Sequence, residues 1–253
     1  MPPRTETVRE MSGPLPFPPD VPMGPLMLAL YNPDYARFGP LLSIDPLIWG
    51  KQEISHSLSA EKHVVAFLGP SASGKDTILR GLDIPYTQII THTTRVHRKD
   101  PSLKDKYIFV QPEEFDAAEQ NGEFIETLPQ TAGCYGTTKN EVERALQREN
   151  RIVVWRGEET GLPAMWRWLT ENHPMVQHHV VFVLPRMPLV DLAVRIIEQR
   201  GADEAKGRIQ KSVREILSAG SIADFIVLNP PQTEGPRDAT RATQNLFTYF
   251  LGR

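Results

Sequence analysis

The feature that most constrains the fold of this chain is the segment over residues 63–82, HVVAFLGPSASGKDTILRGL. An apolar run leads to Gly69, and Gly74 and Lys75 follow after four further residues, at the start of a helical pattern. This order of strand, loop and helix is that of a phosphate-binding P-loop. The two glycines permit backbone turns that a Cβ would hinder, and the lysine supplies a charge for the β- and γ-phosphates. The segment therefore predicts a nucleoside triphosphate site.

Composition narrows the class of protein further. The chain has 253 residues, a net charge of −3 and a single cysteine, Cys134. The near-neutral charge does not favour a nucleic-acid partner, and one cysteine allows neither an internal disulfide nor a cysteine-based zinc site. The sequence contains no apolar run of the roughly eighteen residues needed to span a membrane. We therefore expect a cytoplasmic protein with neither nucleic acid nor membrane as a partner.

The first 58 residues differ from the rest of the chain. Of the 23 prolines, 11 lie in the first 46 residues, and such density excludes a long helix or a central strand. Apolar side chains over residues 26–31 and 41–49 could still dock on the body of the protein. We interpret residues 1–58 as an irregular, partly disordered extension, and residues 59–253 as one folded domain.

Within that domain, predicted strands alternate with predicted helices. The strand patterns lie at residues 64–68, 87–92, 107–110, 123–126, 152–155, 180–184 and 225–229, and helical patterns separate most of them. A capping box at residues 138–141 starts one helix, and residues 189–200, 205–219 and 241–251 form others. This alternation predicts an α/β fold, a three-layer sandwich around a parallel sheet.

Polar side chains over residues 91–137 are candidates for binding a phosphoryl acceptor. Arg95 and Arg98 lie three residues apart, where two guanidinium groups could grip one phosphate. Glu126 ends a short apolar segment, and its carboxylate could accept two parallel bonds from the N1–H and N2 amino edge of guanine. Tyr107 and Tyr135 flank similar segments. Taken singly, these residues could equally be a solvated charge pair, a strand end and rim aromatics.

Together and in this order, these segments resemble the guanylate kinase family. The loop over residues 69–75, GPSASGK, is similar to that family's GPSGxGK, and residues 91–98, THTTRVHR, are similar to its SxTTRxxR. The segments YIFV, GEFIE and YGT, ending at residues 110, 126 and 137, follow in the family's order, as do later landmarks up to residue 229. The resemblance implies a P-loop kinase fold with a mononucleotide-binding part at about 91–137 and a lid at about 195–212.

The resemblance also implies a function: transfer of phosphate from ATP to GMP, in purine nucleotide metabolism, with Mg²⁺ as cofactor. The residues that would bind GMP are Arg95, Arg98, Tyr107 and Tyr135 at its phosphate and Thr91, Glu126 and Thr137 at its base. Those that would bind ATP are Gly69, Pro70, Ser71, Ala72, Ser73, Gly74, Lys75, Asp76, Thr77 and Asn229. The residues with a catalytic role would be Lys75, Arg95, Arg98, Arg200 and Arg208, with Arg195 a weaker candidate.

The chain departs from the family pattern in its P-loop, because Asp76 stands where Ser or Gly is usual. Thr77 could supply the magnesium-side hydroxyl, or the Asp76 carboxylate could bind the ion directly or through water. A GKDT loop is similar to that of ribose 1,5-bisphosphate phosphokinase, a relative on the same fold, and this is the first alternative function. Tyr107, Glu126 and Thr137 favour GMP, because a ribose phosphate offers no base edge to read.

Two further departures affect the acceptor site and the lid. Trp155 stands where the family has the first aspartate of an acidic segment, and Glu158 or Glu159 could substitute from the adjacent loop. The lid segment over residues 200–208 is about three residues shorter than the family's, by comparison with its pattern. These losses keep a second alternative open: a non-catalytic binding module of the kind found in membrane-associated scaffold proteins. The intact glycines and Lys75 favour an enzyme.

Overall fold

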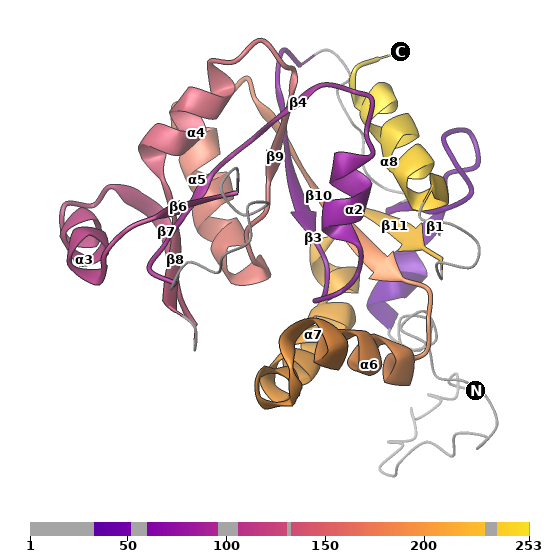
Figure 1. The fold of residues 1–253 in the computed structure, drawn as a ribbon. Coiled ribbons are helices and arrows are strands. Elements are labelled where there is room, and N and C mark those ends of the chain that lie inside the picture. Colours follow the sequence, from indigo (N-terminus) through magenta and orange to yellow (C-terminus); the bar gives the residue numbers. More distant parts are fainter. Residues whose placement is uncertain (1–32, 52–59, 96–105, 131–132, 231–236, 253) are drawn as a thin grey trace, which may run out of the picture.

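The computed structural model describes residues 33–51, 60–95, 106–130, 133–230 and 237–252 (Figure 1). Its larger sheet has seven strands in the order β1-β2-β11-β10-β3-β9-β4. Their bounds are β1 (Phe38–Pro40), β2 (Ile48–Lys51), β3 (His63–Leu68), β4 (Tyr86–Gln88), β9 (Ile152–Trp155), β10 (Gln177–Pro185) and β11 (Phe225–Asn229). The five strands from β11 to β4 are parallel, so their carboxyl ends share one edge, where ligands bind in α/β sheets.

Helices cover both faces of this sheet, which confirms the predicted three-layer architecture. Alternate residues of β3 point to opposite faces, as the period of a strand requires: Val64 and Ala66 join one buried cluster, and Val65 and Phe67 join the other. The first face is covered by α4 (Lys139–Leu146), α5 (Leu162–Asn172), α6 (Leu189–Arg200) and α7 (Ala202–Ile222). The second is covered by α2 (Lys75–Arg80) and α8 (Arg237–Phe250).

A second sheet of four strands projects from the body in the order β6-β5-β8-β7 (Figure 1). Its elements are β5 (Thr91–Thr93), β6 (Tyr107–Phe109), α3 (Pro112–Gln120), β7 (Phe124–Gln130) and β8 (Gly133–Thr138). The single strand predicted over residues 87–92 is in fact two, because β4 pairs in the large sheet and β5 in the small one. The predicted cap of α4 is present, since Thr138 Oγ1 accepts from the Glu141 backbone N–H at 3.3 Å.

Residues 33–51 of the proline-rich extension are joined to the large sheet. A 3₁₀ helix, η1 (Pro33–Arg37), leads into β1, and β2 pairs antiparallel with β11. Ile48 is fully buried, so the apolar stretch over residues 41–49 does reach the core, whereas the stretch over residues 26–31 lies outside the described residues. The mixed edge differs from the purely parallel sheet that the strand–helix alternation predicts. The other residues of the extension, 1–32 and 52–58, lie outside the described residues.

No helix among the residues that the structure describes is long and apolar enough to cross a membrane. A short 3₁₀ turn, η3 (Glu159–Gly161), follows β9 and precedes α5. The helices α6 and α7 meet at Gly201, where the backbone has a φ angle of +81°. This junction lies within the predicted lid, and both helices reach the carboxyl edge of the parallel strands.

Candidate active site

The P-loop, residues 69–74, joins the carboxyl end of β3 to the start of α2. Gly69 and Gly74 have φ angles of +142° and +91°. A Cβ at Gly69 would lie 2.6 Å from the carbonyl oxygen of Val183, and one at Gly74 would lie 2.5 Å from Asn229 Nδ2. Backbone conformation and neighbouring atoms therefore both require glycine at these two positions.

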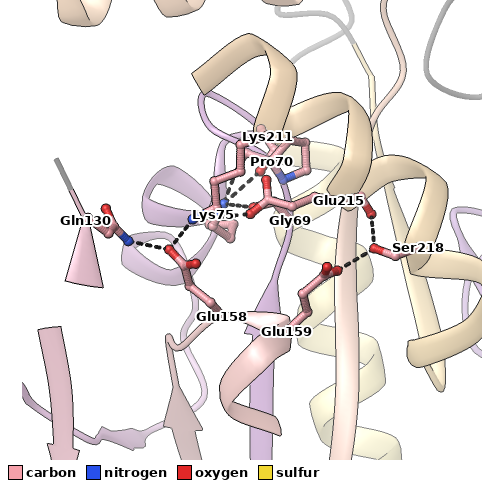
Figure 2. Close-up of polar contacts among 10 residues, drawn as sticks. Gly69, Pro70, Lys75, Gln130, Glu158, Glu159, Lys211, Glu215 and Ser218 are labelled. Atoms are coloured by element: carbon pink, nitrogen blue, oxygen red, sulfur yellow. Dashed lines mark hydrogen bonds and ion pairs between the residues drawn. The ribbon is translucent and has the colours of Figure 1, made fainter. Parts of the chain in front are cut away.

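Lys75 begins α2, and its ammonium group turns back over the loop (Figure 2). Its Nζ donates to the carbonyl oxygens of Gly69 and Pro70, the latter at 2.8 Å, and to Ser73 Oγ at 3.3 Å. Burial lowers the pKa of Lys75 to about 8, an effect that nearby Glu215 opposes. Charge-assisted bonds to phosphate are stronger than bonds to neutral carbonyls, so this group is suited to receive a phosphate oxygen.

Helix α7 brings a carboxylate and a second ammonium group to the loop (Figure 2). Burial raises the pKa of Glu215 to about 7, and the charges of Lys75 and Lys211 oppose this rise. Lys211 Nζ forms an ion pair with Glu158 Oε1, and the same oxygen accepts from Gln130 Nε2 at 2.5 Å. One carboxylate after β9 thus connects the end of β7 with α7.

Asp76 forms two ion pairs at the mouth of the loop. Its Oδ1 pairs with Arg156 Nη2, and its Oδ2 lies 3.1 Å from Lys106 Nζ. Burial alone would raise the pKa of Asp76, but the two cations together lower it below its ordinary value. Asp76 is therefore a carboxylate that links the P-loop helix to the end of β9 and to the residue before β6.

The small sheet presents polar side chains toward the P-loop. Tyr107 and Tyr135 lie edge to face, with ring centroids 5.8 Å apart, and burial raises the pKa of Tyr107. Arg95 Nη2 is buried and has no hydrogen-bond partner among the described residues. A buried guanidinium nitrogen is costly unless it binds an acceptor, and a phosphate would supply one.

Trp155, at the end of β9, lies behind Glu126 and is linked to it through Thr137. Its indole Nε1 donates to Thr137 Oγ1 at 3.0 Å, and that hydroxyl donates to Glu126 Oε1 at 2.6 Å. Trp155 and Thr137 are both fully buried. The indole fits because position 157 is glycine, where a Cβ would lie 1.9 Å from Trp155 Cζ2. Burial raises the pKa of Glu126, and its bonds with Thr137 oppose the rise.

These features surround one cavity of about 520 Å³ between the two sheets and α6 and α7. The predicted residues that line it are Gly69, Ser71, Ala72, Ser73, Gly74, Lys75, Asp76, Thr77, Thr91, Arg95, Tyr107, Glu126, Tyr135, Arg195 and Arg208. The structure therefore brings the loop expected to hold ATP and most of the residues expected to hold GMP to one place.

Among the described residues, Pro70, Thr137 and Asn229 were predicted for the site but do not line this cavity. Pro70 contributes its backbone oxygen to Lys75, and Thr137 lies behind Glu126. Asn229 lies beneath the loop, where its Nδ2 donates to the Ser73 carbonyl oxygen at 2.7 Å. Arg98 and the side chain of Arg200 fall outside the described residues.

Several cavity residues were not predicted from the sequence. They are Arg80, Leu128, Gln130, Arg156, Gly157, Glu158, Glu198, Gln199, Lys211 and Glu215; of these, only Glu158 was considered, as a substitute for the missing aspartate. A signal for two others did exist. Lys211 follows Arg208 by three residues, and Glu215 follows Lys211 by four, so all three lie on one face of a helix.

The chain has a P-loop nucleotide-kinase fold. Its P-loop lies at the carboxyl edge of a parallel sheet, a small sheet faces the loop, and helices α6 and α7 lie beside the same cavity. The guanylate kinase family model matches residues 61–231. The chain therefore belongs to the guanylate kinase family.

Individual relatives agree with this assignment. The chain is 29% identical over 180 residues to a guanylate kinase of Nitrosomonas europaea, and this match covers 69% of this chain and 85% of that protein. It is 31% identical over 166 residues to a guanylate kinase of Parasynechococcus marenigrum, covering 64% of this chain and 86% of the relative. The crystal structure of guanylate kinase from Anaplasma phagocytophilum has the same fold, with a TM-score of 0.54 at 18% identity, covering 77% of this chain and 88% of that one.

Proposed function

We propose that this protein transfers the γ-phosphate of ATP to GMP. The observation that carries the proposal is convergence: Arg95, Glu126 and the two tyrosines of the small sheet face the cavity that also contains Lys75 and the P-loop. The loop and Lys75 would hold the triphosphate, and Arg95 with the tyrosine hydroxyls would hold the phosphate of GMP. Arg98 and Arg200 remain candidates for neutralising the charge of the substrate phosphates.

In this proposal the protein acts by positioning two substrates and neutralising their charge, since phosphoryl transfer makes little covalent demand on the enzyme. Residues 91–137 would be the mononucleotide-binding part and residues 195–212 the lid, within a folded domain over residues 59–253. Arg195 and Arg208 line the cavity from the lid side. Closure over both substrates would keep water from the transferring group.

Magnesium would enter with ATP. Thr77 is exposed at the cavity wall, where its hydroxyl could bind the ion. No cluster of three or more His, Cys, Asp or Glu side chains suited to a metal occurs in the described part of the chain. That fits an ion that takes its other ligands from phosphates and water. Asp76 would bind the ion only by exchanging one of its two ion pairs. The reaction uses cytoplasmic nucleotides, so we place the protein in the cytoplasm.

A coupled assay of ADP release tests this function. The purified chain is given Mg²⁺ and ATP with GMP, dGMP, AMP, ribose 1,5-bisphosphate or no acceptor. We expect rapid ADP release with GMP and little with AMP. Release with ribose 1,5-bisphosphate alone would assign the chain to the other activity considered for a GKDT loop. Binding of ATP without release for any acceptor would instead indicate a non-catalytic module.

A further inference from the structure

The part of the extension that joins the large sheet also holds helix α7. The hydroxyl of Tyr35, in η1, donates to the backbone oxygen of Ile216. Lys51 Nζ, at the end of β2, donates to the backbone oxygen of Ser221 at 3.3 Å. Both acceptors lie in the second half of α7, and the lysine charge is favourable near the carbonyl end of a helix.

The contact between η1 and α7 is unusually close because position 220 is glycine. A Cβ there would lie 2.7 Å from Tyr35 Cδ2 and 2.9 Å from Asp34 Cβ. Glycine inside a helix is less favourable than alanine. Its presence here is explained by the ring that packs against it, and Tyr35 is accordingly only 7% exposed.

The middle of the same segment, between Tyr35 and Lys51, is anchored on another helix. Asp45 is 1% exposed, and its carboxylate pairs with Arg241 Nη1 and accepts from Asn245 Nδ2 at 3.0 Å, both on α8. Its Oδ1 also accepts from the Leu47 backbone N–H at 3.0 Å. Residues 33–51 therefore span from α8, across the edge of the sheet, to α7.

Helix α7 connects this contact with the active site. Its residues Arg208, Lys211 and Glu215 line the cavity, and Glu215 directly precedes Ile216, whose oxygen Tyr35 binds. Lys211 lies five residues before Ile216, about 7.5 Å along the helix axis at a rise of 1.5 Å per residue. A regular helix moves largely as a unit, so a shift of its second half would also move the charged groups that face Lys75.

We propose that residues 33–51 are a positioning element of the active site, which holds α7 so that Glu215 and Lys211 face the P-loop at the correct distance. The inference rests on the proposed function only where GMP turnover is the readout. It assigns the extension a role in catalysis without any contact with substrate, through Tyr35 and Lys51 as positioning residues.

The test uses the full chain with Tyr35→Phe and Lys51→Met together, which remove both hydrogen bonds but keep the ring and the aliphatic stem. Misplacing charged groups at a reacting centre lowers its rate, so we expect kcat for GMP to fall about tenfold. The KM for GMP should change less than twofold, because its proposed ligands lie on the small sheet. Hydrogen exchange in α7 should quicken, and the acid-side pKa of kcat should shift from its parental value.

Two controls separate positioning from stability. Leu246→Val in the core of α8 lowers the unfolding temperature without touching α7, and Tyr249→Phe removes a hydroxyl elsewhere; both should keep the parental kcat. Tyr35→Phe alone is the milder variant if the double variant folds poorly. Parental kcat and pH profile in a folded double variant, or unchanged exchange in α7, would overturn the inference. If the parent itself does not use GMP, the inference is tested by hydrogen exchange in α7 and by the dissociation constant of Mg·ATP. In the double variant we expect that constant to rise severalfold.

Discussion

At the scale of single residues, Glu126 combines two properties that suit it to reading a base edge. One oxygen accepts from Thr137 at 2.6 Å, and the carboxylate faces the cavity. A carboxylate has about four lone-pair directions, so it retains acceptor capacity toward a ligand. The Trp155 indole in turn donates to Thr137, which orients the threonine proton toward Glu126. Trp155 stands where the family pattern has an aspartate, and in this chain it orients the Glu126 carboxylate through Thr137.

Replacing Glu126 with Gln should therefore relax the choice of base. The amide presents a donor where guanine N1–H needs an acceptor, and we expect kcat/KM for GMP to fall about 100-fold, or roughly 3 kcal/mol. Activity with AMP should change much less. Glu123→Gln is the matched control, because Glu123 is exposed on the same segment. An unchanged preference for GMP over AMP in Glu126→Gln would remove this residue from the base site.

The pH dependence of stability tests the environment of Glu215. Its pKa rises from 4.5 to about 7 in the folded protein, so between these values the folded state binds more protons than the unfolded state. The free energy of unfolding should then fall as pH rises through this window, by at most about 1.4 kcal/mol per pH unit from this group. Lys75, with its pKa lowered to about 8, should give the opposite trend above pH 8.

Urea unfolding of the parent and of Glu215→Gln at pH 5, 6 and 7 checks this expectation. The difference in stability between the two proteins should change across the series, because only the parent has this titrating carboxyl. Parallel curves would show that Glu215 titrates normally and that α7 does not bury it.

The sequence was informative about residues whose roles follow from local spacing. The P-loop glycines, Lys75 and the residues of the small sheet form short segments with recognisable order. Arg156 could not be predicted, because its partner Asp76 lies eighty positions away in the chain and only the fold joins β9 to α2. Asn229 was expected to bind ATP, and its contact with the loop, through the Ser73 carbonyl oxygen, follows from the fold and not from its local sequence.

At the scale of elements, the P-loop depends on its surroundings as much as on its own sequence. Gly74 has a φ angle of +91° and lies against Asn229. Gly74→Ala should therefore destabilise the protein by about 1–3 kcal/mol through backbone strain and should weaken ATP binding. Gly207→Ala is the matched control: Gly207 lies within α7 with nothing within 4 Å of its Cβ position, so alanine should stabilise the helix by up to about 1 kcal/mol.

Urea unfolding and ATP titration of both variants check this prediction. Equal effects of the two glycine replacements on stability would show that the loop tolerates a side chain at position 74. Loss of stability at Gly74 with unchanged ATP affinity would separate the fold of the loop from its function.

Elements with strong periodic patterns were predictable, and those defined by distant pairing were not. The buried strands β3, β9, β10 and β11 were each predicted to within a few residues. The division of residues 86–93 between two sheets depends on the partners of β4 and β5. Likewise, β1 and β2 lie in a proline-rich segment whose local pattern does not indicate strands, and they form because β11 offers a free edge.

At the scale of the whole molecule, the cavity lies where three parts of the structure meet: the loop after β9, the small sheet and α7. Glu158 touches all of them: it lies in the loop after β9, accepts from Gln130 at the end of β7 and pairs with Lys211 on α7 (Figure 2). Its side chain is 25% exposed, so the pair is partly shielded from water and should be worth more than a surface pair. This carboxylate therefore helps to set the distance between the small sheet and α7.

Graded replacement of Glu158 tests that role. Glu158→Gln keeps a hydrogen-bonding group for Gln130 but loses the ion pair, and Glu158→Ala loses both. Because the acceptor must lie close to the transferring phosphate, we expect kcat/KM for GMP to fall about tenfold in the first variant and further in the second, with a smaller change in ATP affinity. Glu159→Gln is the control, since Glu159 accepts from Ser218 on α7 but does not line the cavity. If Glu159→Gln and Glu158→Gln lose activity equally, attachment of the loop to α7 suffices, and the bridge across the cavity contributes nothing of its own.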